Sequence, residues 1–403
     1  MPGSTCDRDR NVSRELTNVK LAVIADNYPL GERRVENAFV RQFVHAMSRT
    51  GMECTVFVPV SLVAPRNWPL GPREFREQAG GTVVRVLRPR YVSFSSRQLL
   101  GINTARLTLR TFTDCVRREL QRIDWLPDLV YGHFLYDAGC AAVQLGSRIG
   151  RPSVVSVGEG EFWSVRPHGF GKAKQDLGRA SGLLAVSSVI KEGLIQNLEV
   201  EAERIGVFPN GVDLTLFKPG NREEARRVFG ITGSPFVIAF VGHFHELKGL
   251  KCLLEAVREL SGIALLLVGH GPIRVPDSSP IVFKGTLPHA EIPLALAAAD
   301  AFVLPTRVEG SCNSVIEAMA CGIPVVTSNG RYMDDIVDDD VAVRVDPMDV
   351  RAIRAAIVAL MNDPARRTAI SEACLKRAKQ FDINLRAKRV TAWMEELARS
   401  HRR

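Results

Sequence analysis

Two glutamates, Glu309 and Glu317, have the residue type and the spacing in this chain that most directly suggest chemistry. The apolar run Ala301–Leu304 predicts a short buried strand and Ser314–Cys321 predicts a helix, so Glu309 falls on the loop that leaves the strand. In open α/β sheets ligands bind where strands end, and the free N–H groups at the start of the next helix suit a phosphate. A carboxylate accepts hydrogen bonds in pairs, so each glutamate can hold vicinal hydroxyls of a sugar or a ribose. The pair therefore predicts a nucleotide-sugar site.

A second candidate is the turn Gly242–Gly249, which leaves the predicted strand Phe236–Val241 and opens a helix. Lys248 can meet a phosphate there as a point charge, and Gly242 lets the backbone come close to a ligand. An exposed lysine at a helix start is the alternative interpretation. The turn Gly269-His270-Gly271-Pro272, after the next predicted strand, can pack against a base or a ribose, but on its own it is a weak signal.

The elements that must position these residues alternate along the chain as short apolar runs and segments of helical periodicity. Such alternation predicts βαβ units and two doubly wound, Rossmann-like α/β domains that face each other across a cleft. The predicted strands are Val19–Ala25, Cys54–Val58, Thr82–Leu87, Leu129–Tyr131, Ser153–Val157, Leu183–Val186, Phe236–Val241, Ile263–Val268, Ile281–Phe283, Ala301–Leu304, Pro324–Thr327 and Ala342–Val345. Helices are predicted at Val35–Ser48 and Asp137–Ile149, among others.

The domain boundaries follow from composition. A polar tail over residues 1–18 is expected to be disordered, the first domain spans 19–210 and the second 211–380, with the turn-rich stretch Pro209–Gly220 as the crossing. Residues 381–403 read as a final helix that is free to pack back on the first domain. A chain of 403 residues is too long for one ordinary core, which agrees with two domains.

Composition narrows the functional classes. With 46% hydrophobic and 24% charged residues, and no apolar stretch near the roughly 18 residues that span a bilayer, a soluble globular protein is expected. The first residues lack the apolar core of a secretory signal, so a cytoplasmic location is expected. Eight cysteines occur without a CxxC pair or zinc-type spacing, which favours reduced thiols and no metal site.

The net charge of +9 suggests an anionic partner, and it is concentrated between Arg85 and Arg118. Apolar residues, among them Leu109 and Phe112, alternate with the arginines there. Such a segment suits an anionic membrane surface or an acidic acceptor, with Arg97, Arg106 and Arg110 as candidate contacts, and the location is then peripheral on the cytoplasmic membrane face. A solvated helix face is the alternative. A nucleic-acid partner is not expected.

A set of short motifs resembles the GT4-type retaining glycosyltransferases, including those of bacterial cell-surface polysaccharide biosynthesis, and these enzymes have the GT-B fold. The motifs occur in the family's order and spacing from about Val19 to Leu397, and the joint set is far more specific than any member. They are Val241-Gly242 with Lys248-Gly249, Leu267 to Pro272, Phe283-Lys284-Gly285, Leu304-Pro305-Thr306 with Glu309-Gly310, Ile316 to Val326, Ala185-Val186-Ser187 and Val207 to Asp213.

The resemblance implies a role for each matching residue. Glu309 is expected to face the transferred sugar, Glu317 to hold the ribose, and Lys248 to neutralise the leaving diphosphate in place of a metal, so no cofactor is expected. The implied donor-binding residues are Gly31, Gly242, His243, Lys248, Gly269, Gly271, Lys284, Glu309, Gly310, Ser311, Cys312, Asn313, Ser314 and Glu317. The acidic run Asp334–Asp340 lies where the family has an acidic helix start, which is preferred over a metal site.

Two positions depart from the family pattern. His243 stands where many relatives have an arginine that grips the diphosphate, and Gly158 stands where many have an active-site histidine. His133 and Glu161 are then candidates for catalysis, through acceptor contacts or proton handling. A loop histidine held by the backbone is the alternative for His133.

The loop that leaves the first predicted strand faces the cleft. Gly31 can approach the donor phosphates there, and Arg33 or Arg34 can meet an anionic acceptor; an ordinary loop is the alternative.

The sequence thus predicts a retaining, metal-independent glycosyltransferase. It would carry a sugar from a nucleotide-diphosphate sugar to a saccharide or lipid-linked acceptor of a polysaccharide or glycoconjugate. The alternatives are a nucleotide-sugar epimerase of GT-B shape and a non-catalytic nucleotide-sugar-binding scaffold. An epimerase would need no acceptor, and a scaffold would bind the nucleotide sugar without turnover.

Overall fold

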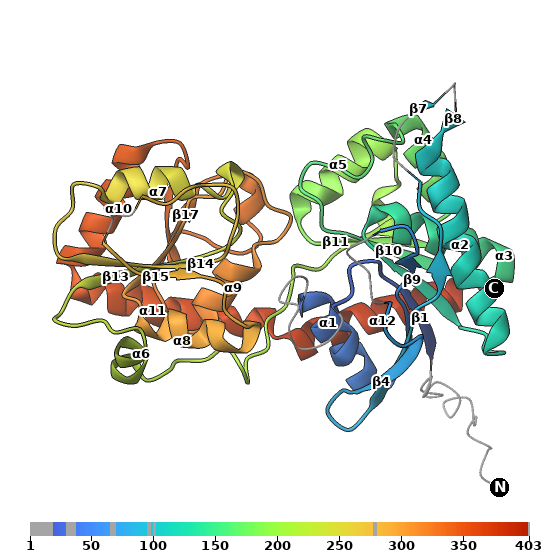
Figure 1. The fold of residues 1–403 in the computed structure, drawn as a ribbon, viewed down its shortest axis with the longest axis horizontal. Helices are drawn as coiled ribbons and strands as arrows, with labels where there is room; N and C mark the ends of the chain where they lie inside the picture. Colours follow the sequence, from blue (N-terminus) through green and yellow to red (C-terminus); the bar gives the residue numbers. More distant parts are fainter. Residues whose placement is uncertain are drawn as a thin grey trace, which may run out of the picture.

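The computed structural model describes residues 19–29, 38–64, 70–94, 98–99, 102–276 and 280–401. Figure 1 shows two α/β lobes, the first domain on the right and the second on the left, joined by extended segments. Both predicted parallel sheets are present, so the expected GT-B architecture of two Rossmann-like halves is confirmed. Gly31, Arg33, Arg34 and Arg97 lie outside the described residues.

The first sheet has eight strands in the order β12-β11-β10-β9-β1-β2-β5-β4, all parallel except the antiparallel edge strand β4. The strands are β1 (Lys20–Ile24), β2 (Glu53–Phe57), β4 (Glu74–Gln78), β5 (Val83–Leu87), β9 (Leu129–His133), β10 (Ser153–Val157), β11 (Gly182–Ala185) and β12 (Ile205–Val207). The helices are α1 (Ala38–Arg49), α2 (Thr104–Arg122), α3 (Cys140–Ile149), α4 (Phe170–Leu177) and α5 (Ser188–Leu198). Two strand pairs, β3 (Val60–Ser61) with β6 (Arg90–Tyr91) and β7 (Gln98–Leu99) with β8 (Ile102–Asn103), lie outside this sheet.

The second sheet is parallel, in the order β15-β14-β13-β16-β17-β18. Its strands are β13 (Phe236–Val241), β14 (Ile263–Val268), β15 (Ile281–Gly285), β16 (Ala301–Leu304), β17 (Val325–Ser328) and β18 (Ala342–Val345). The helices are α6 (Arg222–Val228), α7 (Leu250–Val257), α8 (Ile292–Ala298), α9 (Asn313–Ala320), α10 (Val350–Asn362), α11 (Pro364–Ala378) and α12 (Ile383–His401). Short helical turns lie at Leu135–Gly139, Ala202–Arg204, Glu246–Lys248 (η4), His289–Glu291 (η5), Arg331–Met333 and Lys379–Phe381.

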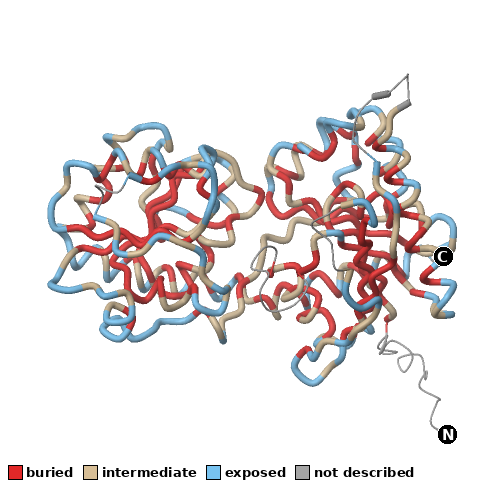
Figure 2. The backbone as a smooth tube through the Cα atoms, in the orientation of Figure 1, coloured by how far each residue is buried: buried red, intermediate tan, exposed pale blue. Residues whose placement is uncertain are grey.

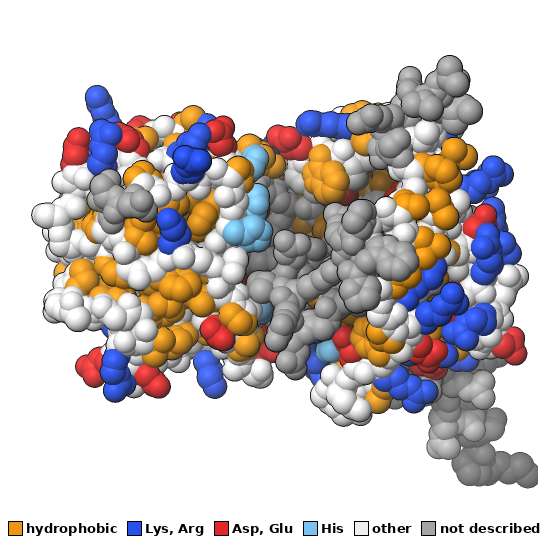
Figure 3. All heavy atoms as spheres, viewed as in Figure 1, with side chains coloured by type: hydrophobic (Ala, Val, Ile, Leu, Met, Phe, Trp, Pro, Cys, Tyr) orange, Lys and Arg blue, Asp and Glu red, His pale blue; other side chains and the backbone are white. Residues whose placement is uncertain are grey.

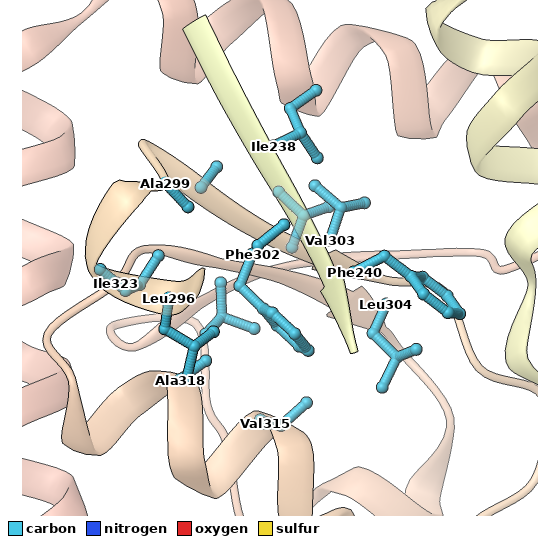
Figure 4. Packing of buried hydrophobic residues seen from close by; sticks show 14 of the residues in the cluster. Ile238, Phe240, Leu296, Ala299, Phe302, Val303, Leu304, Val315, Ala318 and Ile323 are labelled. Carbon is cyan, nitrogen blue, oxygen red and sulfur yellow. The ribbon is translucent and has the colours of Figure 1, made fainter. Parts of the chain in front are cut away.

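Central strands of both sheets are buried along their whole length because helices cover both faces, which explains their unbroken apolar sequences. In the first domain α1 and α12 pack on one face, while Phe112 of α2 and Leu145 of α3 lie in the cluster on the other. Figure 2 shows the buried chain at the centre of each lobe and the exposed chain around it. In the second domain Phe302 and Leu304 of β16 pack near Val315 of α9 (Figure 4).

The predicted helix Asp137–Ile149 differs from expectation at its start, where a wide turn over Leu135–Gly139 precedes α3. Of the predicted helix Val35–Ser48, the described part is α1 from Ala38. The strands β4 and β12 have no counterpart among the predicted strands, because the residues of β4 are polar and β12 is only three residues long.

The last helix, α12, returns to the first domain (Figure 1). Its residues Ala387, Val390 and Met394 are fully buried in the first-domain core. The two crossing segments run side by side, since Val212 N–H donates to Phe381 O at 2.8 Å and Ile383 N–H donates to Val212 O at 2.9 Å. No helix in the described ranges is long and apolar enough to cross a bilayer.

One side chain of α12, Arg386, ties this helix to the crossing segment. Arg386 is 7% exposed, and its guanidinium donates to Pro209 O at 2.7 Å and to Phe208 O at 3.4 Å. It also lies 3.9 Å from the ring centroid of Phe43 on α1. Burial lowers the pKa of Arg386 to about 10, so the group is still charged at neutral pH.

We expect Arg386→Met to lower the free energy of unfolding by about 2 kcal/mol, because two carbonyls lose their donor and the cation–π contact is lost. Urea unfolding followed by circular dichroism measures this. Arg389→Met, an exposed arginine on the same helix, is the matched control and should leave the midpoint within error. Equal midpoints for the two variants would show that Arg386 does not hold the crossing.

Candidate active site

A pocket of about 350 Å³ lies where the two domains meet, at the carboxyl ends of strands from both sheets. The first domain contributes Phe134, Gly158, Glu159, Gly160, Glu161 and Trp163, and the second contributes His243, His245, Leu247, Lys248, Val308, Glu309 and Gly310. In Figure 3 histidine side chains gather on the second lobe where it faces the first. The position agrees with the expectation that ligands bind where parallel strands end.

Glu309 follows β16 and is nearly buried, with 9% of its side chain exposed. Its Oε1 accepts three hydrogen bonds, from Lys248 Nζ at 2.6 Å, Thr306 Oγ1 at 2.9 Å and Cys312 Sγ at 3.5 Å. Among the described residues, no donor reaches the second oxygen, Oε2. One carboxylate oxygen is therefore fixed by the protein, while the other can accept a hydrogen bond from a ligand.

Lys248 ends the turn η4, and this turn is bonded to the β16 loop. Leu247 O accepts from Thr306 Oγ1 at 3.1 Å and from Arg307 N–H at 2.8 Å, which brings Lys248 beside Glu309. Burial is the largest single influence and would lower the pKa of Lys248, but the charge and hydrogen bond of Glu309 together with Cys312 more than offset it, so the pKa is raised. Lys248 is therefore protonated at neutral pH and carries the positive charge of the pocket.

Glu317 lies on α9 with 13% of its side chain exposed, and Oε1 is 2.9 Å from His289 Nε2. His289 Nδ1 in turn lies 3.4 Å from Gln42 Nε2 on α1 of the first domain, and its ring packs edge-on against Phe217 at 5.1 Å. Glu317 is thus connected to the opposite domain through one imidazole. No local sequence pattern marks His289, because its partners are 28 and 247 positions away along the chain.

The predicted phosphate loop Gly310–Ser314 contacts the crossing segment. Asn210 N–H donates to Ser311 Oγ at 3.0 Å, and Asn210 Nδ2 donates to Asn313 Oδ1 at 2.8 Å. The side chains of Ser311 and Asn313 are therefore engaged in holding the loop, and Cys312 Sγ is directed to Glu309. What the loop presents to a ligand is mainly its backbone.

The two domains touch backbone to backbone at Gly310 and Gly158. A Cβ added at Gly310 would overlap the carbonyl oxygen of Gly158, so only glycine permits this approach. Gly158, which stands where many relatives have an active-site histidine, is therefore in direct contact with the loop after Glu309.

Three imidazoles lie beside the pocket. The rings of His243 and His245 are 6.0 Å apart, and the rings of His243 and His270 are 5.3 Å apart. Gly269 and Gly271, both at positive φ, let the loop after β14 pass against the backbone of Gly242 and Phe244. Gly269 and Gly271 thus bring the loops after β13 and β14 together.

The remaining predicted residues are dispersed. Lys284 is exposed on the edge strand β15 and does not line the pocket. Arg106 and Arg110 are exposed on α2, whereas Leu109 and Phe112 are buried in the core. Leu109 and Phe112 are therefore not available to a membrane or an acceptor, because α2 uses them to pack on the sheet, and the contacts suggested for Arg106 and Arg110 stay a prediction.

The acidic run Asp334–Asp340 makes protein contacts. Asp335 accepts hydrogen bonds from Ser188 N–H and Ser188 Oγ, both at 2.7 Å, at the start of α5 in the first domain. Asp334 pairs with Arg344, and Asp338 lies 3.7 Å from Arg377. Among the described residues no group of three or more histidine, cysteine, aspartate or glutamate side chains is arranged to hold a metal ion.

Glu161 lines the pocket with half of its side chain exposed, 3.3 Å from Arg166. His133, by contrast, is 5% exposed and does not itself line the pocket, with Nδ1 2.8 Å from Tyr131 Oη and its ring behind the pocket residue Phe134. Burial, with a smaller contribution from Arg386, lowers the pKa of His133 to about 3. The imidazole is therefore neutral, and its suggested role in acceptor binding stays a prediction.

This depressed pKa makes the stability of the first domain sensitive to acid. An unfolded histidine takes up a proton below about pH 6.5 whereas folded His133 does so only near 3, so stability is lost as the pH falls through this window. When the pH is lowered from about 7.5 to about 5, the wild-type protein should lose up to about 2 kcal/mol more unfolding free energy than the His133→Asn variant.

Urea titrations at both pH values measure the difference. His401→Asn, which changes an exposed histidine, should keep the wild-type pH dependence. An unchanged pH dependence in His133→Asn would show that folded His133 titrates like a free histidine.

Comparison with protein families gives two matches that together span both domains. Residues 37–216 match the family described as Glycosyltransferase Family 4, and residues 235–363 match the family described as Glycosyl transferases group 1. Among curated proteins, the chain is 27% identical over 375 residues to a D-inositol 3-phosphate glycosyltransferase of Segniliparus rotundus, covering 86% of this chain and 80% of that protein. It is 26% identical over 393 residues to the putative teichuronic acid biosynthesis glycosyltransferase TuaC of Bacillus subtilis, covering 92% and 96%.

Solved structures agree on the fold. Sucrose-phosphate synthase from Thermosynechococcus elongatus superposes with a TM-score of 0.79 at 19% identity, covering 95% of this chain and 100% of that one. Anabaena HepE in complex with UDP-glucose superposes with a TM-score of 0.71 at 20% identity, covering 94% and 99%. With two family matches in the expected order and the GT-B arrangement of its domains, the chain belongs to the GT4-type glycosyltransferases.

Proposed function

We propose that this glycosyltransferase moves a sugar from a nucleoside diphosphate sugar to a saccharide or lipid-linked acceptor, with retention of configuration and without a metal ion. The observation that carries the proposal is the Lys248–Glu309 ion pair, in a pocket that both domains line, directly before α9. In the proposed complex the diphosphate lies against Lys248 and the backbone N–H groups of Gly310–Ser314.

The chemistry follows from where charge develops. As the glycosidic bond breaks, negative charge grows on the leaving phosphate oxygen, and a fixed ammonium group in a partly dry pocket stabilises it more than water does. Lys248 supplies that charge, and Glu309 offers Oε2 to a hydroxyl of the transferred sugar. Glu317, held by His289, holds the ribose hydroxyls. Retention follows if the acceptor attacks from the face that the diphosphate leaves.

The nucleotide is proposed to be uridine diphosphate. Support comes from the similar HepE structures, which hold UDP and UDP-glucose. For the acceptor, the relatives named as inositol phosphate and teichuronic acid glycosyltransferases suggest a polyhydroxylated, anionic compound. Exposed Arg106 and Arg110 on α2 are then candidate contacts for the anionic acceptor or for the cytoplasmic membrane face.

The epimerase alternative is not favoured, because the curated relatives named above are transferases. A scaffold without turnover is also less well supported, since the ion pair and the free carboxylate oxygen form a site suited to catalysis.

We expect the purified chain to transfer sugar from a panel of nucleotide sugars in the presence of EDTA, with the anomeric configuration of the donor retained in the product. Lys248→Met and Glu309→Gln should each reduce transfer by about 10²-fold or more, because each removes a charge that acts in the transition state. Radiolabel transfer measures the rate, and proton NMR of the product gives the configuration.

Lys251→Met is the matched control, since Lys251 is exposed, paired with Glu246, and one turn away. It should transfer at the wild-type rate. Wild-type rates in Lys248→Met or Glu309→Gln would contradict the site. A product with inverted anomeric configuration, or loss of transfer in EDTA, would contradict the mechanism.

A further inference from the structure

Trp163 is the most exposed large hydrophobic side chain among the described residues, at 62%. Trp163 lines the active-site pocket from the first domain, and Lys248 and Glu309 line it from the second. Scattered exposed aliphatic residues need no explanation, but an indole exposed inside a ligand pocket does. None of the donor roles proposed above uses it.

The loop around Trp163 is constructed so that this side chain points away from the core. Buried Glu159, 3% exposed, accepts from Leu135 N–H at 3.4 Å and from Ser164 N–H at 3.1 Å, which fixes both ends of the turn. Phe162 has φ of 49°, a left-handed conformation that is unfavourable for a bulky residue, and its side chain is buried beside Gly193. With Phe162 turned inward, its neighbour Trp163 is left outward.

Backbone strain of this kind is retained mainly where it serves a site. Phe134, which also lines the pocket, has φ of 73°. One strained aromatic residue thus lines the cavity, and the other directly precedes Trp163 in the chain.

The groups around the indole suit a sugar ring. A pyranose has a face of C–H groups, which the electron-rich face of an indole attracts, and a rim of hydroxyls that need polar partners. Glu161 and Arg166 are both at least half exposed next to Trp163, and they supply an acceptor and a donor on the same loop. A membrane-binding surface would instead need several apolar side chains together, whereas charged residues flank this one.

We propose that Trp163 is the stacking platform for a sugar ring of the acceptor, with Glu161 and Arg166 binding the hydroxyls at its edge. The inference rests on the proposed function. The donor groups Lys248 and Glu309 line the second-domain side of the same pocket, so a ring on Trp163 faces them across it. An acceptor hydroxyl held there is directed at the donor sugar, and the acceptor must carry a saccharide rather than a lipid at the point of attachment.

The binding test uses tryptophan fluorescence with UDP present. Wild-type protein is titrated with methyl glycosides of glucose, galactose, mannose, N-acetylglucosamine and glucuronic acid. At least one should give a saturable change, which Trp163→Phe should abolish although three other tryptophans remain. Trp125→Phe, which changes a tryptophan bonded to Glu53 away from the pocket, should keep the signal.

The kinetic test uses the saccharide with the largest signal as acceptor. Trp163→Ala should raise the acceptor KM by about tenfold or more, and Trp163→Phe should raise it less because a smaller aromatic face remains. The Kd for UDP should be unchanged in both variants, which separates acceptor binding from donor binding.

No saturable change with any glycoside, the same change in Trp163→Phe, or an unchanged acceptor KM in Trp163→Ala would overturn the inference while leaving the proposed function intact. A signal from anionic phosphatidylglycerol vesicles but from no glycoside would also overturn it. Failure of wild-type protein to bind UDP or any nucleotide sugar would instead overturn the proposed function, and this inference with it.

Discussion

The ion pair between Lys248 and Glu309 is the interaction on which the rest of the site depends. Removing both charges from water is costly, and a pair that is largely buried is stable only when further hydrogen bonds satisfy it. Thr306 and Cys312 provide these on one carboxylate oxygen. The pair therefore keeps a cation and a free carboxylate oxygen fixed at the end of β16 before any ligand arrives. Such preorganisation is what electrostatic stabilisation of a leaving group requires.

The first-domain side of the pocket is held opposite this ion pair by contacts at several points of the domain boundary. Gly310 meets Gly158 directly, Asn210 bonds to the loop after Glu309, and His289 links Glu317 to α1. The helix α12 fastens the crossing by burying its apolar side in the first domain. Because these contacts hold the two domains together at several points, the position of the first-domain loop with Glu161 and Trp163 relative to Lys248 and Glu309 is defined.

The sequence allowed much of this to be predicted, and the reasons are physical. Strands buried on both faces have continuous apolar runs, so β13, β14 and β16 were located with their observed bounds. The strand, loop and helix pattern around Glu309 and Glu317 likewise placed Glu309 on the loop after β16 and Glu317 on α9. Contacts between distant segments have no local pattern. The pairing of His289 with Glu317 and the burial of His133 are of this kind, and so is the engagement of Ser311 and Asn313 by Asn210.

The central claim is that the donor diphosphate binds where Lys248 now meets Glu309. A crystal structure of the protein with UDP tests it most directly. The account predicts that Lys248 Nζ lies about 3 Å from a phosphate oxygen, with the ribose hydroxyls on Glu317. A nucleotide bound elsewhere, or a diphosphate more than about 4 Å from Lys248 while the Lys248–Glu309 pair remains closed, would contradict it.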